Sequence, residues 1–182
     1  MARRESISRE GILAAAFELL KEEGMGAVTA RRLAARANCS TQPIFRVFKG
    51  MDEVEEGLFG LAAAFFEEYY QVYPVQSEVA FVNIGLAYIR FAALHKHVFS
   101  LLFVSEARYG KTLYDLINGE KGTIGREMAR AKAGGTQDAG GLFMKMWMVI
   151  HGAACMSLTG DYDLGEEETR GMLEEVCKSF SP

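Results

Sequence analysis

The chain has 182 residues, enough for one or two small domains with a buried core, and 49% of them are hydrophobic. Its three cysteines are widely spaced with no CxxC pair, so we expect a reducing cytoplasm and no disulfide. The net charge of −4 argues weakly against a nucleic-acid partner for the chain as a whole, and the N-terminus does not fit a signal peptide.

The charge is unevenly distributed along the chain. Residues 1–49 hold nine Lys and Arg against five Asp and Glu, a net charge of +4, whereas residues 50–182 carry a net charge of −8. A basic head on an acidic body is typical of a DNA-binding segment joined to a body that does not bind DNA.

The chain begins with a short basic segment and a helix. Residues 1–7 include Arg3 and Arg4 and are either an arm that reaches a phosphate or minor groove, or a frayed tail. Apolar residues spaced by three and four then predict a helix over residues 8–23, with Gly24 at its C-terminal end.

The next stretch, from Thr29 to Phe48, predicts two short helices joined by a tight turn. Thr29 and Ser40 are suitable N-caps, and Asn38 tolerates the left-handed backbone that such a turn requires. Ile44 and Phe48 share a face that can pack on the preceding helix. Three arginines of the first short helix point elsewhere: Arg31, Arg32 and Arg36.

This pattern predicts a helix-turn-helix, and its alternative is an ordinary helical hairpin with a solvated basic face. Thr41 and Gln42 stand at the start of the expected recognition helix, where side chains meet base edges. Arg46, Lys49 and the Thr29 hydroxyl are better placed for phosphates.

Beyond residue 50 the chain predicts further helices and no strand. A long helix over residues 52–73 has two apolar stripes and ends before Pro74, so we place the domain boundary near residue 50, between domains 1–50 and 51–182. The remaining expected elements are a helix over 78–94 capped by Ser77, a short helix over 97–104, two helical pieces within 110–135, a loop or weak helix start over 134–141, a strongly apolar helix over 142–158 and an amphipathic helix over 166–180. The expected fold class is therefore all-α.

Residues 8–60 resemble the DNA-binding domain of TetR-family transcriptional regulators. The matching positions are Thr29, Leu33-Ala34, Ala37, Asn38-Cys39, Ser40, Phe45 and Phe48. The resemblance implies an N-terminal three-helix DNA-binding domain and a C-terminal helical domain that binds a small ligand and dimerises through its last two helices. Phe45 and Met51 depart from the family, which often has a phosphate-binding Tyr and Lys there. The predicted DNA-contacting residues are Thr29, Arg31, Ser40, Thr41, Gln42, Phe45, Arg46 and Lys49.

The second half carries a narrower resemblance. Trp147, His151 and Gly152 are similar to the Trp…His-Gly signature of one C-terminal subclass of the family, and the segment STQPIFRVF also resembles that subclass.

Aromatic and methionine side chains in the body predict a cavity for an apolar or aromatic effector, although most of them are expected to be core. Candidate polar groups include Arg90, His95 and His151, and a buried His is more often structural than functional. The predicted ligand-binding residues are Phe66, Tyr70, Tyr88, Phe91, Phe103, Trp147 and His151. No cofactor or metal site is expected.

The apolar 142–158 helix needs more cover than the last helix supplies, which predicts a two-fold homodimer through residues 142–158 and 166–180; a monomeric core helix is the alternative. We therefore expect a cytoplasmic regulator, most simply a repressor, that binds a palindromic double-stranded DNA operator and is released by a small effector, with no membrane partner. The alternatives are a ligand-binding dimer that has lost DNA affinity and an enzyme that uses His151 and Cys155. The apolar surroundings of this pair, which lack an orienting acid, disfavour the enzyme.

Overall fold

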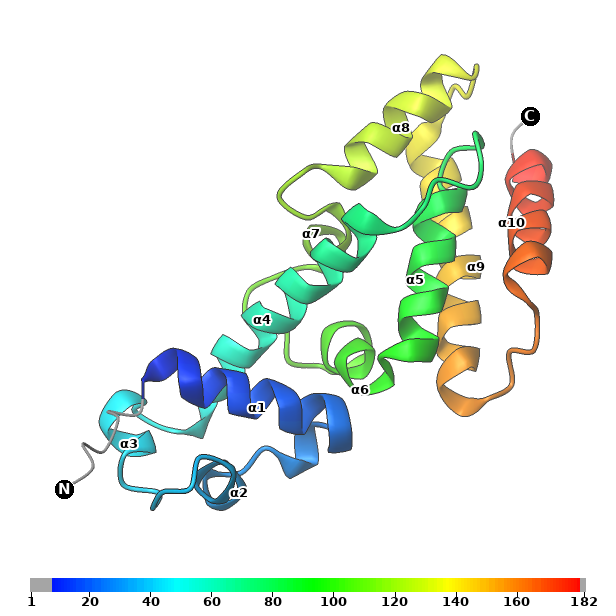
Figure 1. The fold of residues 1–182 in the computed structure, drawn as a ribbon. Helices are drawn as coiled ribbons and strands as arrows, with labels where there is room; N and C mark the ends of the chain where they lie inside the picture. The colour runs from blue at the N-terminus through cyan, green and yellow to red at the C-terminus, as the bar shows by residue number, and fades with distance from the viewer. Residues whose placement is uncertain (1–7, 181–182) are drawn as a thin grey trace. The chain divides into compact units, whose positions relative to one another are not determined.

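A computed structural model of the chain describes residues 8–180, so the expected basic arm over residues 1–7 lies outside the described part. Every regular element within residues 8–180 is helical, which confirms the predicted all-α fold (Figure 1). The chain forms two compact units. One contains residues up to Phe65 together with His97–Gly110, and the other contains Phe66–Lys96 and the residues from Lys111 onward.

The first unit is built on three N-terminal helices. Its elements are α1 (Arg9–Glu23), the 3-10 turn η1 (Met25–Ala27), α2 (Ala30–Arg36), α3 (Ile44–Val47), the first part of α4 (Met51–Val72), most of α6 (Lys96–Phe99) and the π-helical turn η2 (Ser100–Val104). Ser8 caps α1 by accepting the N–H of Gly11 at 3.1 Å. As predicted, Gly24 ends this helix, with a φ of 84° that favours glycine.

Arg9 joins α1 to the start of α4. Its guanidinium lies 4.3 Å from the centroid of the Phe48 ring and donates to Glu53 Oε1 at 2.7 Å. The other oxygen of Glu53 accepts the backbone N–H of Lys49 at 2.8 Å. The Lys49 N–H and then the Arg9 side chain lower the pKa of Glu53. These contacts fix the end of the helix-turn-helix stretch on α1.

The second unit contains the longest-range packing in the chain. Its elements are the end of α4, α5 (Val82–Leu94), α7 (Leu113–Asn118), α8 (Thr123–Ala133), α9 (Ala139–Thr159) and α10 (Glu166–Phe180). α5, α9 and α10 lie side by side (Figure 1). They meet at Gly85, where a Cβ atom would lie 2.9 Å from both Ile150 Cδ1 and Leu173 Cδ1, so the absence of a side chain permits this close approach.

α9 is the one helix within residues 8–180 that is long and apolar enough to cross a membrane by length and composition alone. It packs against α5, α8 and α10 through Leu142, Met146 and Ile150, all of which are buried. One side of α9 is therefore packed within the folded domain.

Several helices begin or end at residues other than those predicted, and the clearest difference is at α5. The expected helix over 78–94 begins at Val82, because Phe81 adopts a φ of 67° and interrupts it. Ser77 does not cap this helix: its hydroxyl donates to Glu174 Oε1 at 2.6 Å, and it accepts the N–H of Val79 at 3.2 Å. A partner 97 residues away therefore determines the role of Ser77.

Smaller changes occur elsewhere. α4 begins at Met51 and ends at Val72, one residue before the predicted bounds at each end. The apolar helix α9 begins at Ala139 instead of 142, because the Asp138 side chain accepts the N–H of Gly141 at 2.8 Å and caps it. The two helical pieces expected within 110–135 are confirmed as α7 and α8.

Glu127 stabilises the unusual backbone at Phe81. Its carboxylate is 5% exposed and accepts the Phe81 N–H at 2.6 Å, while Arg130 lies 3.8 Å away. We predict that Glu127→Ala lowers the free energy of unfolding by about 1–3 kcal/mol, because the buried N–H loses its acceptor. Glu127→Gln keeps an amide oxygen there and should lose less. Urea denaturation of both variants measures this difference, and a Glu127→Ala protein as stable as the wild type would contradict it.

Candidate functional site

The turn between α2 and α3 has the geometry expected of a helix-turn-helix. Thr29 caps α2, since its Oγ1 accepts the N–H of Arg32 at 3.4 Å. At the other end Asn38 has a φ of 49°, and the N–H groups of Asn38 and Cys39 donate to the carbonyls of Ala35 and Ala34 at 3.2 and 2.9 Å. This pair of bonds is a Schellman motif with Asn38 at the left-handed position. The predicted N-cap role of Thr29 and the predicted turn role of Asn38 are confirmed.

The predicted capping role of Ser40 is wrong. α3 begins at Ile44, and its N-cap position is Pro43. A serine cap at position 40 would bond the N–H two or three residues later, and the residue three later is Pro43, which has none. The carbonyl of Thr41 instead accepts the N–H of Ile44 at 3.1 Å, so Ser40, Thr41 and Gln42 lie in an exposed turn before α3.

All eight predicted DNA-contacting side chains are exposed in the first unit. Ile44 and Phe48, in contrast, are buried and hold α3 in place. Phe45 is 50% exposed, so packing alone does not account for it, and its ring is available to stack on a sugar or base. Whether these eight residues contact DNA stays a prediction.

Only part of the basic surface of this unit is free to meet an anion. Arg36 forms two hydrogen bonds of 2.7 Å with Glu22, and Arg32 forms a two-point contact with Glu23. These bonds lower the pKa values of both carboxyl groups. The predicted set of outward arginines is therefore reduced, because Arg32 and Arg36 are held against α1. Within residues 8–180, the exposed cations of this unit that form no ion pair are Arg31, Arg46 and Lys49.

In the second unit, five of the seven predicted ligand-binding residues form one aromatic cluster. The Phe66 ring lies 5.0 Å from Phe91 and 5.9 Å from Tyr88, between ring centroids. Tyr88 lies 4.7 Å from Trp147, and His151 stacks on Trp147 at 5.8 Å. Phe66, Tyr88, Phe91 and Trp147 are buried. The predicted clustering of these side chains is thus observed, while their contact with a ligand stays a prediction.

His151 is hydrogen-bonded through both ring nitrogens. Tyr88 Oη lies 3.0 Å from Nδ1, and Cys155 Sγ lies 3.6 Å from Nε2. Burial raises the pKa of the Cys155 thiol, which favours the neutral form over the reactive thiolate. No group of three or more side chains able to bind a metal occurs within residues 8–180.

The other two predicted ligand-binding residues are Phe103 and Tyr70. Phe103 belongs to the first unit, where its ring lies 5.1 Å from that of Phe99. Tyr70 lies half-buried on α4, and burial raises the pKa of its hydroxyl. The chain re-enters the first unit at residues 97–110, and contact of Phe103 and Tyr70 with a ligand stays a prediction.

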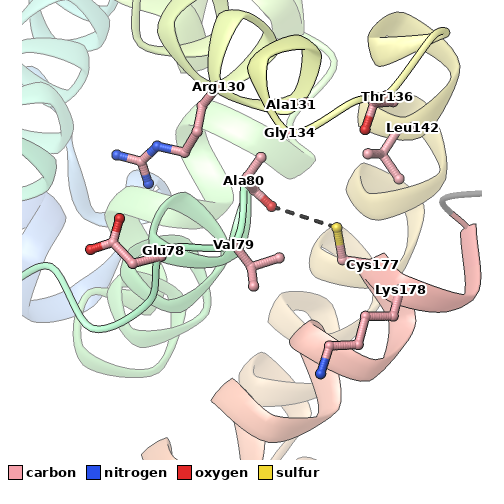
Figure 2. Close-up of a pocket in the computed structure, with 10 residues that line it drawn as sticks. All are labelled: Glu78, Val79, Ala80, Arg130, Ala131, Gly134, Thr136, Leu142, Cys177 and Lys178. Carbon is pink, nitrogen blue, oxygen red and sulfur yellow. Dashed lines mark hydrogen bonds between the residues drawn. The ribbon is translucent and has the colours of Figure 1, made fainter.

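Two cavities of about 210 Å³ each open in the second unit, and none of the seven predicted residues lines either one. Figure 2 shows the first, between the segment before α5, α8, the start of α9 and the end of α10. There the Cys177 thiol points to the carbonyl of Ala80 at 3.8 Å. The second lies beside α5, α9 and α10, and its wall includes Arg90, one of the predicted polar groups.

Comparison with known families covers both halves of the chain. Residues 12–56 match the sequence model described as bacterial regulatory proteins, tetR family, and residues 81–180 match the tetracyclin repressor-like C-terminal domain. The second description is general, so the assignment to the Trp…His-Gly subclass stays a prediction. A comparison with curated proteins gave no match.

Solved structures with the same fold include three bacterial proteins. A TetR family transcriptional regulator from Vibrio parahaemolyticus is 17% identical, with a TM-score of 0.66 over 93% of this chain and 96% of that one. A TetR family member from Streptomyces coelicolor A3 is 15% identical, with a TM-score of 0.62 over 92% and 96%. A TetR-like transcriptional regulator from Rhodococcus sp. RHA1 is 14% identical, with a TM-score of 0.62 over 92% and 91%. At these identities the likeness shows the fold.

Proposed function

The chain belongs to the TetR family of bacterial transcriptional regulators, which are DNA-binding proteins and not enzymes, and from this premise we propose that it is an effector-responsive repressor acting as a homodimer in the cytoplasm. Each subunit places α3 and the turn before it on one half of a palindromic operator. A small apolar or aromatic effector in the second unit releases the DNA.

The observation that supports DNA binding best is the set of exposed groups around α3. Thr41 and Gln42 precede the helix, where an amide can make two hydrogen bonds to adenine. Arg46 and Lys49 follow them and, like Arg31, form no ion pair within residues 8–180. Hydrogen-bond donors beside uncommitted cations suit a surface that reads bases and neutralises phosphates.

The exposed side of α9 supports the proposed dimer. Met144, Met148 and Met156 are 55%, 62% and 47% exposed, and Gly152 continues the same four-residue spacing. The opposite side of α9 is already buried within the subunit. An apolar stripe beside α10 is suited to a second copy packed around a two-fold axis, with both helices of each subunit contributing.

The aromatic cluster supports an apolar effector. Its side chains present large apolar surfaces, while Tyr88 and His151 supply a hydroxyl and an imidazole for orientation. Because the rings already pack on one another, a ligand must displace some of these contacts. Phe66 lies on α4, which continues without interruption into the first unit, so repacking at Phe66 can alter the helix that carries the DNA-binding end.

DNA binding is tested by two arginines of the same unit that differ in their partners. Arg46→Ala should reduce the slope of log affinity against log salt by about one per subunit, because one phosphate contact is lost. Arg32→Ala should leave the slope nearly unchanged, because Arg32 is bound to Glu23. Fluorescence anisotropy with duplex DNA measures both slopes. If the wild type ignores duplex DNA at low salt, the alternative of a ligand-binding dimer without DNA affinity is correct.

The dimer is tested by introducing a charge on the methionine stripe. Met148→Glu should weaken self-association at least about tenfold, since two carboxylates would meet across the interface. Val75→Glu makes the same change at a residue that is 71% exposed outside α9 and α10, and it should leave the dimer intact. Sedimentation velocity measures both variants. A monomeric wild type, or a Met148→Glu variant as dimeric as the wild type, would contradict the proposed interface.

The effector site is tested through Trp147, the single tryptophan, which is 6% exposed. A neutral aromatic probe that enters the cluster, such as phenol or indole, should change the Trp147 emission and lower operator affinity by about 5- to 150-fold. Tyr88→Phe should weaken this response, whereas Tyr114→Phe, on a 45% exposed residue, should not. Probes that release the operator without altering Trp147 emission would place the effector elsewhere.

A further inference from the structure

The cavity beside Arg90 has an apolar floor and a size suited to a small ligand. Leu86 and Ile89 of α5 are buried there, and Ala93 and Leu164 extend the apolar surface toward the opening. Its volume of about 210 Å³ is below the range of roughly 300–1,000 Å³ that accommodates drug-sized molecules. A single ring or a short hydrocarbon chain would fit this space.

Most polar groups of the wall are already paired. Tyr73 Oη donates to Glu166 Oε1 at 2.7 Å, and Gln76 donates to the same oxygen. Tyr162 Oη and Thr169 Oγ1 lie 2.8 Å apart, and the Ser157 hydroxyl donates to the carbonyl of Ala153 at 3.0 Å. These groups are satisfied within the subunit, so they do not require a ligand.

Arg90 differs from the other polar groups of the wall. It forms no ion pair within residues 8–180. The pKa of Glu166 is lowered mainly by the hydrogen bonds from Gln76 and Tyr73, and the positive charge of Arg90 makes a smaller contribution. Its guanidinium carries five N–H donors in a planar fork. The cavity wall therefore contains a positively charged group, the Arg90 guanidinium, whose N–H groups can donate to a ligand that lies on the apolar floor.

The cations that line the cavity of Figure 2 differ from Arg90, because their positions are explained by contacts within the protein. These two cations, Arg130 and Lys178, lie in the last turns of α8 and α10, where a positive charge offsets the negative end of the helix dipole. Arg130 also lies 3.8 Å from the carboxylate of Glu127. Arg90 does not lie in the last turn of α5, so it does not offset a helix dipole, and it forms no ion pair within residues 8–180.

We propose that the cavity beside Arg90 binds a small organic carboxylate. The carboxylate pairs with the guanidinium of Arg90, and the hydrocarbon body lies on Leu86 and Ile89. Glu166 is the competing group in the wall, since it accepts the hydrogen bonds of Tyr73 and Gln76 on one oxygen, Oε1, and an ammonium ligand would have to pair with it. This site is separate from the aromatic cluster, and its occupation requires no opening of the Tyr88–Trp147 contact.

Isothermal titration calorimetry of the full chain tests this assignment without DNA, so its outcome is independent of operator binding. Benzoate and hexanoate should bind with saturation, whereas benzamide and hexylamine should bind at least about tenfold more weakly, because they lack the charge that Arg90 pairs. Arg90→Met should cause a similar loss for the two carboxylates. Lys132→Met removes an exposed charge from α8 and should leave their affinity unchanged.

A second variant tests the cavity itself. Ala93→Trp adds a bulky side chain at the exposed opening and should abolish carboxylate binding while Arg90 is still present, with circular dichroism confirming that the variant is folded. Absence of saturable carboxylate binding to the wild type would overturn the proposal. Equal binding of the amide, tighter binding of the amine, or full affinity in Arg90→Met or Ala93→Trp would also overturn it.

Discussion

The close approach of α5, α9 and α10 at Gly85 is the constraint on which the second unit depends. A Cβ atom there would lie 2.9 Å from the Cδ1 atoms of Ile150 and Leu173, so glycine lets these two side chains pack against α5 without shifting. The packing of the three helices buries one side of α9 and leaves its methionine side exposed. It also brings Tyr88 of α5 to Trp147 and His151 of α9, 59 and 63 residues later in the chain, and sets Arg90 at the edge of a cavity. One packing arrangement thus underlies the proposed interface and both proposed ligand sites.

In the first unit, the number of basic residues is larger than the number of basic residues that are free of ion pairs. The basic excess of residues 1–49 suggests a broad anion-binding surface, yet Arg9, Arg32 and Arg36 form ion pairs with Glu53, Glu23 and Glu22. The Arg32–Glu23 and Arg36–Glu22 pairs are exposed and contribute little to folding stability, whereas the Arg9–Glu53 pair is partly buried. Among the exposed cations of this unit, they leave Arg31, Arg46 and Lys49 without an ion pair within residues 8–180. Selective pairing of this kind favours a defined DNA footprint over diffuse attraction to any polyanion.

Local patterns predicted the helices well, and long-range partners determined where prediction failed. Thr29 and Asn38 act within a few residues of themselves, so their roles followed directly from the sequence. Ser77 looked like a cap, but Glu174 of α10 is its partner. For Ser40 the sequence does contain a local warning, because Pro43 lacks one of the two N–H groups that such a cap could bond. For the sites, residue type alone identified the aromatic cluster, whereas only the folded chain placed Phe103 in the other unit and Arg90 at a cavity.

The central claim is that two identical subunits each use one helix-turn-helix on a shared duplex. Selection of bound sequences from a random duplex library at moderate salt tests it most directly, because no operator need be assumed. The account predicts enrichment of an inverted repeat whose half-sites are separated by about one helical turn or a multiple of it. Recovery of a single unrepeated half-site, or of no motif, would contradict a two-fold regulator.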